Sequence, residues 1–261
     1  MISVQNISKS YESPSFFGKK KLFEAVKDVS FNLFAGKTLG LVGESGCGKS
    51  TIGKIIAHLT KPTKGQIFFQ GNNTQILSQV QQSSLRKDIQ IIFQDPFSSL
   101  NPRHTVFQML SEVLIYHEIP LNHSLIDTVT YTLERVGLRK EHLNRYPHEF
   151  SGGQRQRLVI ARALSLQPKV LICDEPVSAL DVSIQSQIIN LLIDLQKDFG
   201  LTYLFISHSL SVVKHISHDV AVMYLGKIVE YGSCNQIFSN PQHSYTKLLL
   251  DSIPKFSDIN S

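Results

Sequence analysis

The stretch that decides the fold reads Gly43-Glu44-Ser45-Gly46-Cys47-Gly48-Lys49-Ser50. Its glycines let backbone amides approach a polyphosphate, and Lys49 supplies a cation. An apolar strand is expected before it, over residues 39–42, and the spacing of Ile52, Ile55, Ile56 and Leu59 predicts a helix after it. The positive end of such a helix and the loop amides form one anion site. The sequence therefore predicts that this loop, together with Thr51, binds a nucleoside triphosphate.

The composition of the 261 residues is that of an ordinary globular protein, with 42% apolar and 18% charged residues. The apolar runs are far shorter than the roughly 18 residues that span a bilayer, and residues 1–10 do not resemble a secretory signal. We therefore expect a cytosolic chain that does not cross a membrane by itself. The three cysteines, Cys47, Cys173 and Cys234, have no metal-binding spacing and predict neither a disulfide framework nor a zinc site.

The formal charge of +5 and the pI near 9.0 raise the question of an acidic partner. The only dense basic run is Lys19, Lys20 and Lys21, in a stretch that reads as a loop. A solvated loop is the preferred interpretation. Contact of this run with anionic lipid headgroups is the alternative.

Alternation of apolar and polar residues predicts antiparallel strands over residues 2–11, 25–33 and 66–71, flanking the nucleotide-binding strand. Helical spacing dominates from residue 72 to about residue 166, which predicts an inserted helical subdomain. Two apolar runs, 170–173 and 203–206, enclose a helical pattern and predict a parallel sheet. Residues 220–224 and 227–231 read as a hairpin.

Two carboxylates follow the apolar run at residues 170–173, in the Walker B arrangement of phosphate-loop enzymes. Asp174, with the Ser50 hydroxyl and phosphate oxygens, is suited to hold Mg²⁺, which prefers oxygen ligands. Glu175 is then free to orient and deprotonate the attacking water. Cys47, close to a helix N-terminus, is expected in an environment that favours the thiolate.

A third motif, Ser151-Gly152-Gly153-Gln154, precedes another helical pattern. Its hydroxyl, its glycine amides and a helix N-terminus make a second anion site. The motif resembles the signature of ATP-binding cassette (ABC) proteins and lies between the phosphate loop and the acidic pair, as in that family. The resemblance implies a dimer, in which the signature of one subunit closes over ATP held by the other.

The resemblance covers almost the whole chain and implies the α/β phosphate-loop NTPase fold of ABC ATPases, a mixed-sheet core with an antiparallel β subdomain and an inserted helical subdomain. The core is expected at about 1–71 and 167–235, the helical subdomain at about 72–166, and a short tail at about 236–261. Further residues match the family one by one: Tyr11 the aromatic residue that stacks on adenine, Gln94 the glutamine that contacts Mg²⁺, and His208 the switch histidine at the γ-phosphate. Residues 178–181 match the loop that communicates across the dimer.

Two stretches narrow the resemblance to the ATPases of peptide and nickel importers. Residues 93–103 resemble the docking segment after the glutamine loop, and residues 240–249 resemble a C-terminal phrase of that subfamily. Residues 154–157 look like the second of two nonidentical ATPases, which implies a heterodimer, although a homodimer stays open. The chain has no cysteine-rich extension, so no iron–sulfur cluster is expected.

The resemblance implies an ATPase that uses ATP and Mg²⁺ at the cytoplasmic face of the cell membrane. Its expected partners are a second ATPase, two permease subunits and an extracytoplasmic solute-binding protein, without nucleic acid. Di- or oligopeptides are the first expectation for the cargo, and nickel or a metal chelate the second. A soluble ABC enzyme that acts on nucleic acid, and a regulatory module that binds ATP without hydrolysis, are the alternative classes.

Overall fold

The computed structural model describes residues 1–13, 21–95, 99–121 and 123–252. They divide into two compact units, residues 1–77 with those from Leu204 onward (unit 1), and residues 78–203 (unit 2). The strand β8 (Thr202–Ser207) contains one of the two boundaries. Lys19 and Lys20 of the basic run, and Pro96, Phe97 and Ser98 of the expected docking segment, lie outside the described residues.

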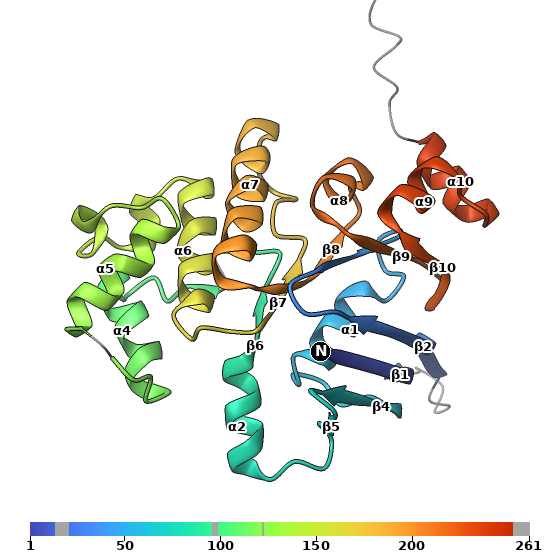
Figure 1. The fold of residues 1–261 in the computed structure, drawn as a ribbon, viewed down its shortest axis with the longest axis horizontal. Coiled ribbons are helices and arrows are strands. Elements are labelled where there is room, and N and C mark those ends of the chain that lie inside the picture. The colour runs from blue at the N-terminus through green and yellow to red at the C-terminus, as the bar shows by residue number, and fades with distance from the viewer. Residues whose placement is uncertain (14–20, 96–98, 122, 253–261) are drawn as a thin grey trace, which may run out of the picture. The chain divides into compact units, whose positions relative to one another are not determined.

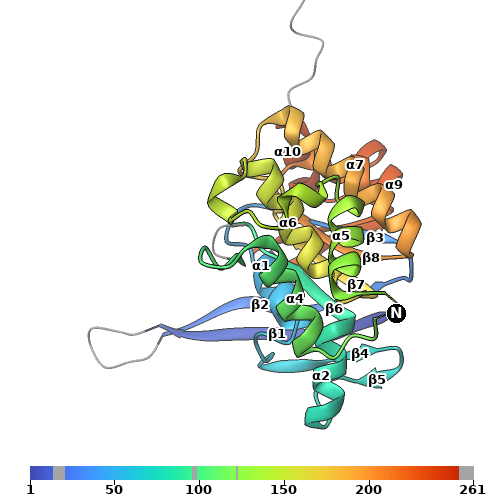
Figure 2. The ribbon, with the colours of Figure 1, turned by 90° about the vertical axis from the view of Figure 1, so that its left-hand side faces the viewer.

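Unit 1 contains an antiparallel sheet and a mixed group of strands (Figure 1). In the antiparallel sheet, β1 (Ile2–Ser13) lies between β2 (Lys21–Leu33) and β4 (Lys64–Phe69), and β5 (Asn72–Asn73) follows β4. Figure 2 shows these strands side by side. The expectation that they flank the nucleotide-binding strand is wrong, because they pair among themselves in a sheet of their own.

The mixed strands of unit 1 are centred on β9 (Asp219–Tyr224). It pairs in parallel with β3 (Thr38–Val42) and antiparallel with β10 (Lys227–Ser233), so the predicted hairpin is confirmed. All five residues of β3 are buried, which explains its continuous apolar character. Among its described residues, this unit also contains the helices α1 (Lys49–Ile56), α8 (Leu210–Ile216), α9 (Cys234–Ser239) and α10 (Ser244–Asp251).

The helix α1 begins at Lys49, as the phosphate-loop pattern predicts, and buries Ile52, Ile55 and Ile56. It ends at Ile56, one turn earlier than the apolar spacing suggests. Leu59 lies beyond this end and is 56% exposed. The apolar spacing by itself therefore overestimates the length of this helix.

Unit 2 consists mainly of helices: α2 (Gln79–Asp88), α4 (Val106–Tyr116), α5 (Leu125–Arg135), α6 (Gly152–Leu164) and α7 (Val182–Phe199), with 3₁₀ turns at Lys140–His142 and Pro147–Glu149. It also holds the parallel pair β6 (Ile89–Ile92) and β7 (Val170–Asp174). The strand β6 lies in a stretch that the sequence predicts as largely helical. Its four residues, Ile-Gln-Ile-Ile, are too few for a helical period to be recognised, and β-branched residues favour a strand.

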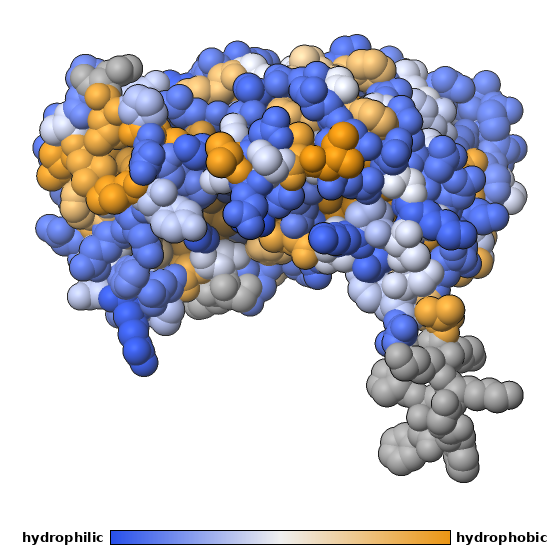
Figure 3. Space-filling view, turned by 90° about the horizontal axis from the view of Figure 1, so that it is seen from below, coloured by the Kyte–Doolittle hydropathy of each residue, from blue (hydrophilic) through white to orange (hydrophobic). Residues whose placement is uncertain are grey.

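Apolar side chains remain exposed where α4 ends and α5 begins, among them Ile115 and Ile126. Figure 3 shows hydrophobic atoms gathered at the left-hand end of the view, over the elements that Figure 1 labels α4 and α5. No helix among the described residues combines the length and the apolar character needed to cross a membrane.

Candidate functional site

The phosphate loop joins β3 to α1 in unit 1, and two of its glycines are required by the surrounding backbone. A Cβ atom on Gly43 would collide with the carbonyl oxygen of Met223, at the end of β9, and one on Gly48 would collide with the carbonyl oxygen of Ala25, in β2. Both residues also have positive φ, of 150° and 109°. The loop is therefore built in contact with two strands, and its shape depends on them.

Lys49 is buried, although it carries the charge of the loop. Its Nζ donates to the carbonyl oxygens of Gly43, at 2.7 Å, and Glu44, at 2.8 Å. Two neutral acceptors offset part of the cost of burying an ammonium group. The cation is thus held at the loop itself, beside Cys47, whose Sγ lies 3.9 Å away.

Cys47 does not have the environment expected from the sequence. Burial raises the pKa of its thiol, and the nearby Lys49 charge and hydrogen bonds only partly oppose that effect. The expectation of a thiolate is therefore wrong.

Tyr11 lies near the end of β1, opposite Phe23 in β2. Its side chain is 39% exposed, and Lys9 Nζ lies 5.1 Å from its ring centroid. The ring is therefore available at the surface, as a residue that stacks on a base must be. His208, also in unit 1, follows β8 directly and is exposed.

In unit 2, the two acids at the end of β7 differ in their exposure to solvent. Asp174, the last residue of the strand, is 5% exposed, whereas Glu175 is half-buried. Glu175 has φ 50°, a left-handed conformation that a non-glycine residue adopts at some cost. Its Oε2 accepts a hydrogen bond from Gln94 Nε2, at 3.3 Å. The residues predicted to be catalytic are Glu175, Gln94 and His208, and the structure brings the first two together.

The loop after these acids is tied back to Glu175. Ser178 Oγ donates to the Glu175 carbonyl oxygen, at 3.1 Å, and Asp181 is the N-cap of α7. The backbone on the C-terminal side of Glu175 is thereby closed into a turn. Movement of residues 178–181 would act directly on the backbone of the predicted base.

The third motif forms the start of α6. Ser151 Oγ accepts from Gln154 N, at 3.3 Å, and Gln154 Oε1 accepts from Ser151 N, at 3.1 Å, which is a capping box. As an acceptor in this cap, the serine oxygen keeps its own proton for donation to a phosphate oxygen. A Cβ on Gly153 would lie 2.6 Å from Ile184 Cγ2, in α7, so that glycine permits close packing of two helices.

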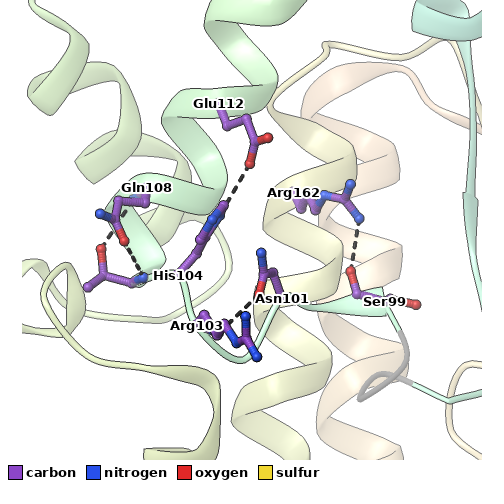
Figure 4. A network of polar contacts seen from close by, with 8 residues as sticks. Ser99, Asn101, Arg103, His104, Gln108, Glu112 and Arg162 are labelled. Atoms are coloured by element: carbon purple, nitrogen blue, oxygen red, sulfur yellow. Dashed lines mark hydrogen bonds and ion pairs between the residues drawn. The ribbon is translucent and has the colours of Figure 1, made fainter.

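The described part of the expected docking segment is held by polar contacts within unit 2 (Figure 4). Arg162 Nη1, on α6, donates to Ser99 O at 3.0 Å, and Asn101 Oδ1 accepts from Arg103 N at 3.0 Å. His104 Nδ1 lies 3.3 Å from Glu112 Oε2. The segment therefore enters α4 in a defined conformation, although Asn101 and Arg103 are exposed.

One contact to the phosphate loop was missed by the sequence analysis. Tyr245, at the start of α10, is 8% exposed, and its hydroxyl accepts a hydrogen bond from Glu44 N, at 3.1 Å. Its ring lies 4.1 Å from that of Tyr224, centroid to centroid. The only sequence feature that pointed to Tyr245 was the resemblance of residues 240–249 to the importer subfamily. A contact between residues 201 positions apart leaves no periodic pattern in the sequence.

Comparison with known proteins places these motifs in a family. Residues 26–178 match the family model described as "ABC transporter", and residues 229–260 match that of the "Oligopeptide/dipeptide transporter, C-terminal region". Similar curated proteins include the glutathione import ATP-binding protein GsiA of Escherichia coli (strain K12) and that of Shigella dysenteriae serotype 1. Each is 57% identical over 230 residues, which cover 88% of this chain and 37% of the relative. The chain thus corresponds to little more than a third of these relatives.

Solved structures agree in fold. A dimeric ATP-binding cassette in a post-hydrolysis state, bound to ADP and Pi, has a TM-score of 0.79 and 27% identity, covering 90% of this chain and 99% of that one. The protein cbiO1 from Clostridium perfringens, part of the ABC transporter complex cbiONQ, has a TM-score of 0.78 and 28% identity, covering 92% and 90%. The family model spans more than half of the chain and includes the phosphate loop, the Ser-Gly-Gly-Gln motif and the two acids. This chain belongs to the ABC transporter family.

Proposed function

We propose that this protein is the ATP-hydrolysing subunit of a membrane importer that takes up di- or oligopeptides. The observation that carries the proposal is the match of residues 229–260 to the oligopeptide/dipeptide transporter region, on a chain whose preceding part matches the ABC transporter model. The relatives named for glutathione import support the same class of cargo, since glutathione is itself a small peptide. A nickel or metal-chelate importer is the other cargo class that the sequence resemblance allows.

ATP would be bound by Tyr11 at the base and by residues 43–51 at the phosphates. Ser151, Gly152, Gly153 and Gln154 of a partner ATPase subunit would close over the γ-phosphate, with His208 contacting it. The capping box at Ser151 supports this role, because it leaves a hydroxyl proton and helix amides for an anion. ATP binding would join two ATPase subunits, as a heterodimer or a homodimer, and hydrolysis would release them.

The donor set fits Mg²⁺, which takes oxygen ligands and binds through one or two carboxylates while keeping several waters. Asp174, Ser50 and Gln94 would hold it, and the ion would neutralise charge on the phosphates. Glu175 would accept the proton of the attacking water, in an orientation supported by Gln94. Separate carboxylates thus serve the metal and the proton transfer.

The exposed segment around Asn101 and Arg103 would transmit these events to two permease subunits, with the ATPase at the cytoplasmic face of the membrane. A solute-binding protein outside the membrane would select the cargo. Within this subunit we propose a core at about 1–71 with 167–235, a helical subdomain at about 72–166 and a short tail at about 236–261.

The test is to express the chain with its neighbouring permease and solute-binding genes, purify the complex and reconstitute it in vesicles. ATP-dependent uptake of labelled di- and oligopeptides is expected, and uptake should be lost with Glu175→Gln. Uptake of a nickel chelate without peptide would favour the other cargo class. Purification of an active ATPase with which no permease subunit co-purifies would contradict the transport role.

A further inference from the structure

The C-terminal helix α10 is bonded to the phosphate loop, and we infer that Tyr245 is a positioning residue that holds this loop in the shape that ATP binds. The inference rests on the proposed binding of ATP at residues 43–51. It adds a residue that lies outside every nucleotide motif of the chain and in the region matched by the oligopeptide/dipeptide transporter model.

The two sides of the Glu44 residue are fixed by different partners. Its N–H donates to Tyr245 Oη at 3.1 Å, and its carbonyl oxygen accepts from Lys49 Nζ at 2.8 Å. Lys49 must interact with phosphate when nucleotide arrives, so its bond to the loop carbonyls is shared or exchanged at that moment. The hydrogen bond from Glu44 N–H to Tyr245 Oη does not involve the Lys49 ammonium, so it can persist while Lys49 changes partners.

Tyr245 is itself well positioned to act in this way. The residue is buried, its ring packs on Tyr224 at 4.1 Å between centroids, and Tyr224 directly follows Met223, whose carbonyl oxygen contacts Gly43. A tyrosine has only two side-chain torsions to fix, so little entropy is lost in holding its hydroxyl in place. The same end of β9 therefore supports the loop through its backbone and through an aromatic ring.

The start of α10 has its own anchor in unit 1. Glu230, in β10, accepts hydrogen bonds from Gln242 N at 2.7 Å and His243 N at 3.0 Å, immediately before the helix. Carboxylate acceptors near a helix N-terminus are favourable for charge as well as for hydrogen bonding. Glu230 thereby fixes the segment from which Tyr245 reaches the phosphate loop.

The chemical consequence is preorganisation. A loop already held in its binding conformation loses less conformational freedom when ATP binds, so affinity is higher than for a loop free to move. Removal of the hydroxyl leaves a partly buried N–H without this acceptor and permits the Glu44 peptide to rotate. ATP binding weakens, whereas proton transfer to Glu175, in unit 2, continues at its own rate.

The experiment compares Tyr245→Phe, which keeps the ring and removes only the hydroxyl, with the unchanged protein in its transporter complex. Tyr231→Phe, in β10, is the matched control that removes a tyrosine hydroxyl elsewhere in unit 1. The Kd of a fluorescent ATP analogue and the KM for ATP are expected to rise about three- to tenfold, as a typical hydrogen bond allows. The kcat should stay within about twofold, and Tyr231→Phe should leave Kd and KM unchanged.

A purely structural role would lower the melting temperature without changing Kd or KM, and that result overturns the inference. If Tyr245→Phe does not fold, Glu230→Gln is used instead, and it is expected to raise KM in the same direction by a smaller factor. Unchanged KM in Glu230→Gln would then be the contrary outcome. Lys49→Ala distinguishes failure of the positioning role from failure of the proposed ATP site. If Lys49→Ala loses ATP binding and Tyr245→Phe has no effect, only the positioning role is rejected. If Lys49→Ala still binds ATP, the phosphate loop is rejected as the ATP site.

Discussion

Gln94 Nε2 lies 3.3 Å from Glu175 Oε2, which links the second residue after β6 to the residue that follows β7. The two strands pair in parallel, so their carboxyl ends lie at the same edge. The contact orients the carboxylate that we propose as the general base. Residues 81 positions apart in the sequence are thereby brought to one point in unit 2.

Replacement of Glu175 by Gln should stop hydrolysis and preserve ATP binding. The amide has nearly the shape of the carboxylate but cannot accept the proton of the attacking water, so kcat is expected to fall by about 10²–10⁴. Steady-state turnover and nucleotide binding measure the two effects, and the ATP-bound dimer should persist in size-exclusion chromatography. Unchanged turnover would show that another group is the base.

Replacement of Gly43 by Ala should destabilise unit 1 and weaken ATP binding. The new Cβ would collide with the Met223 carbonyl oxygen, and strain of this kind costs about 3 kcal/mol. Gly71→Ala is the control, because Gly71 also has positive φ, of 85°, but no atom lies within 4 Å of the added Cβ. It should cost about 1 kcal/mol from backbone strain alone. Equal free energies of unfolding for the two variants would contradict the packing argument.

Replacement of Gly153 by Ala should separate α6 from α7. The added Cβ would lie 2.6 Å from Ile184 Cγ2, an overpacking cost of about 1–3 kcal/mol that exceeds the gain of about 1 kcal/mol in helix propensity. At Gly152 the nearest atom would be 3.4 Å away, an ordinary contact, so Gly152→Ala should be neutral or stabilising. Denaturant unfolding distinguishes the variants, and a Gly153→Ala protein as stable as the parent would refute this packing.

Alkylation of Cys47 should require higher pH than alkylation of a free thiol. Burial raises the pKa of Cys47, so at a given pH a smaller fraction is the reactive thiolate. The midpoint of the rate of iodoacetamide labelling against pH is expected above that of N-acetylcysteine, and MgATP should slow labelling further. A midpoint below that of the free thiol would restore the interpretation based on the helix N-terminus.

Replacement of Arg162 by Ala should impair coupling to the permease and leave the affinity of the ATPase subunit for ATP unchanged. The change removes the hydrogen bond to Ser99 O that holds the start of the docking segment. Transport-coupled turnover in the assembled complex is expected to fall about two- to tenfold, the effect of one hydrogen bond. Arg135→Ala, which removes the surface pair with Asp198 in the same unit, should not have this effect. Equal coupling in both variants would argue against a docking role for this segment.

The sequence by itself determined the local elements that have a strong periodic or compositional pattern. The phosphate loop, the buried strand before it, the hairpin of β9 and β10, and the serine that caps α6 are all readable from neighbouring residues. Local steric and hydrogen-bonding preferences act over a few positions, and a single sequence records them directly. The family resemblance followed from the order of three such motifs.

Only the tertiary structure decided how strands were shared between sheets, where α1 ended and which distant groups reached the motifs. The strand β6 was too short to be recognised from its sequence pattern. The raised pKa of Cys47 depended on burial of its side chain in the folded protein. Tyr245 meets Glu44 across 201 positions because β9, β10 and the turn held by Glu230 return the chain to the phosphate loop. Such contacts arise from packing between elements, and no spacing within either segment encodes them.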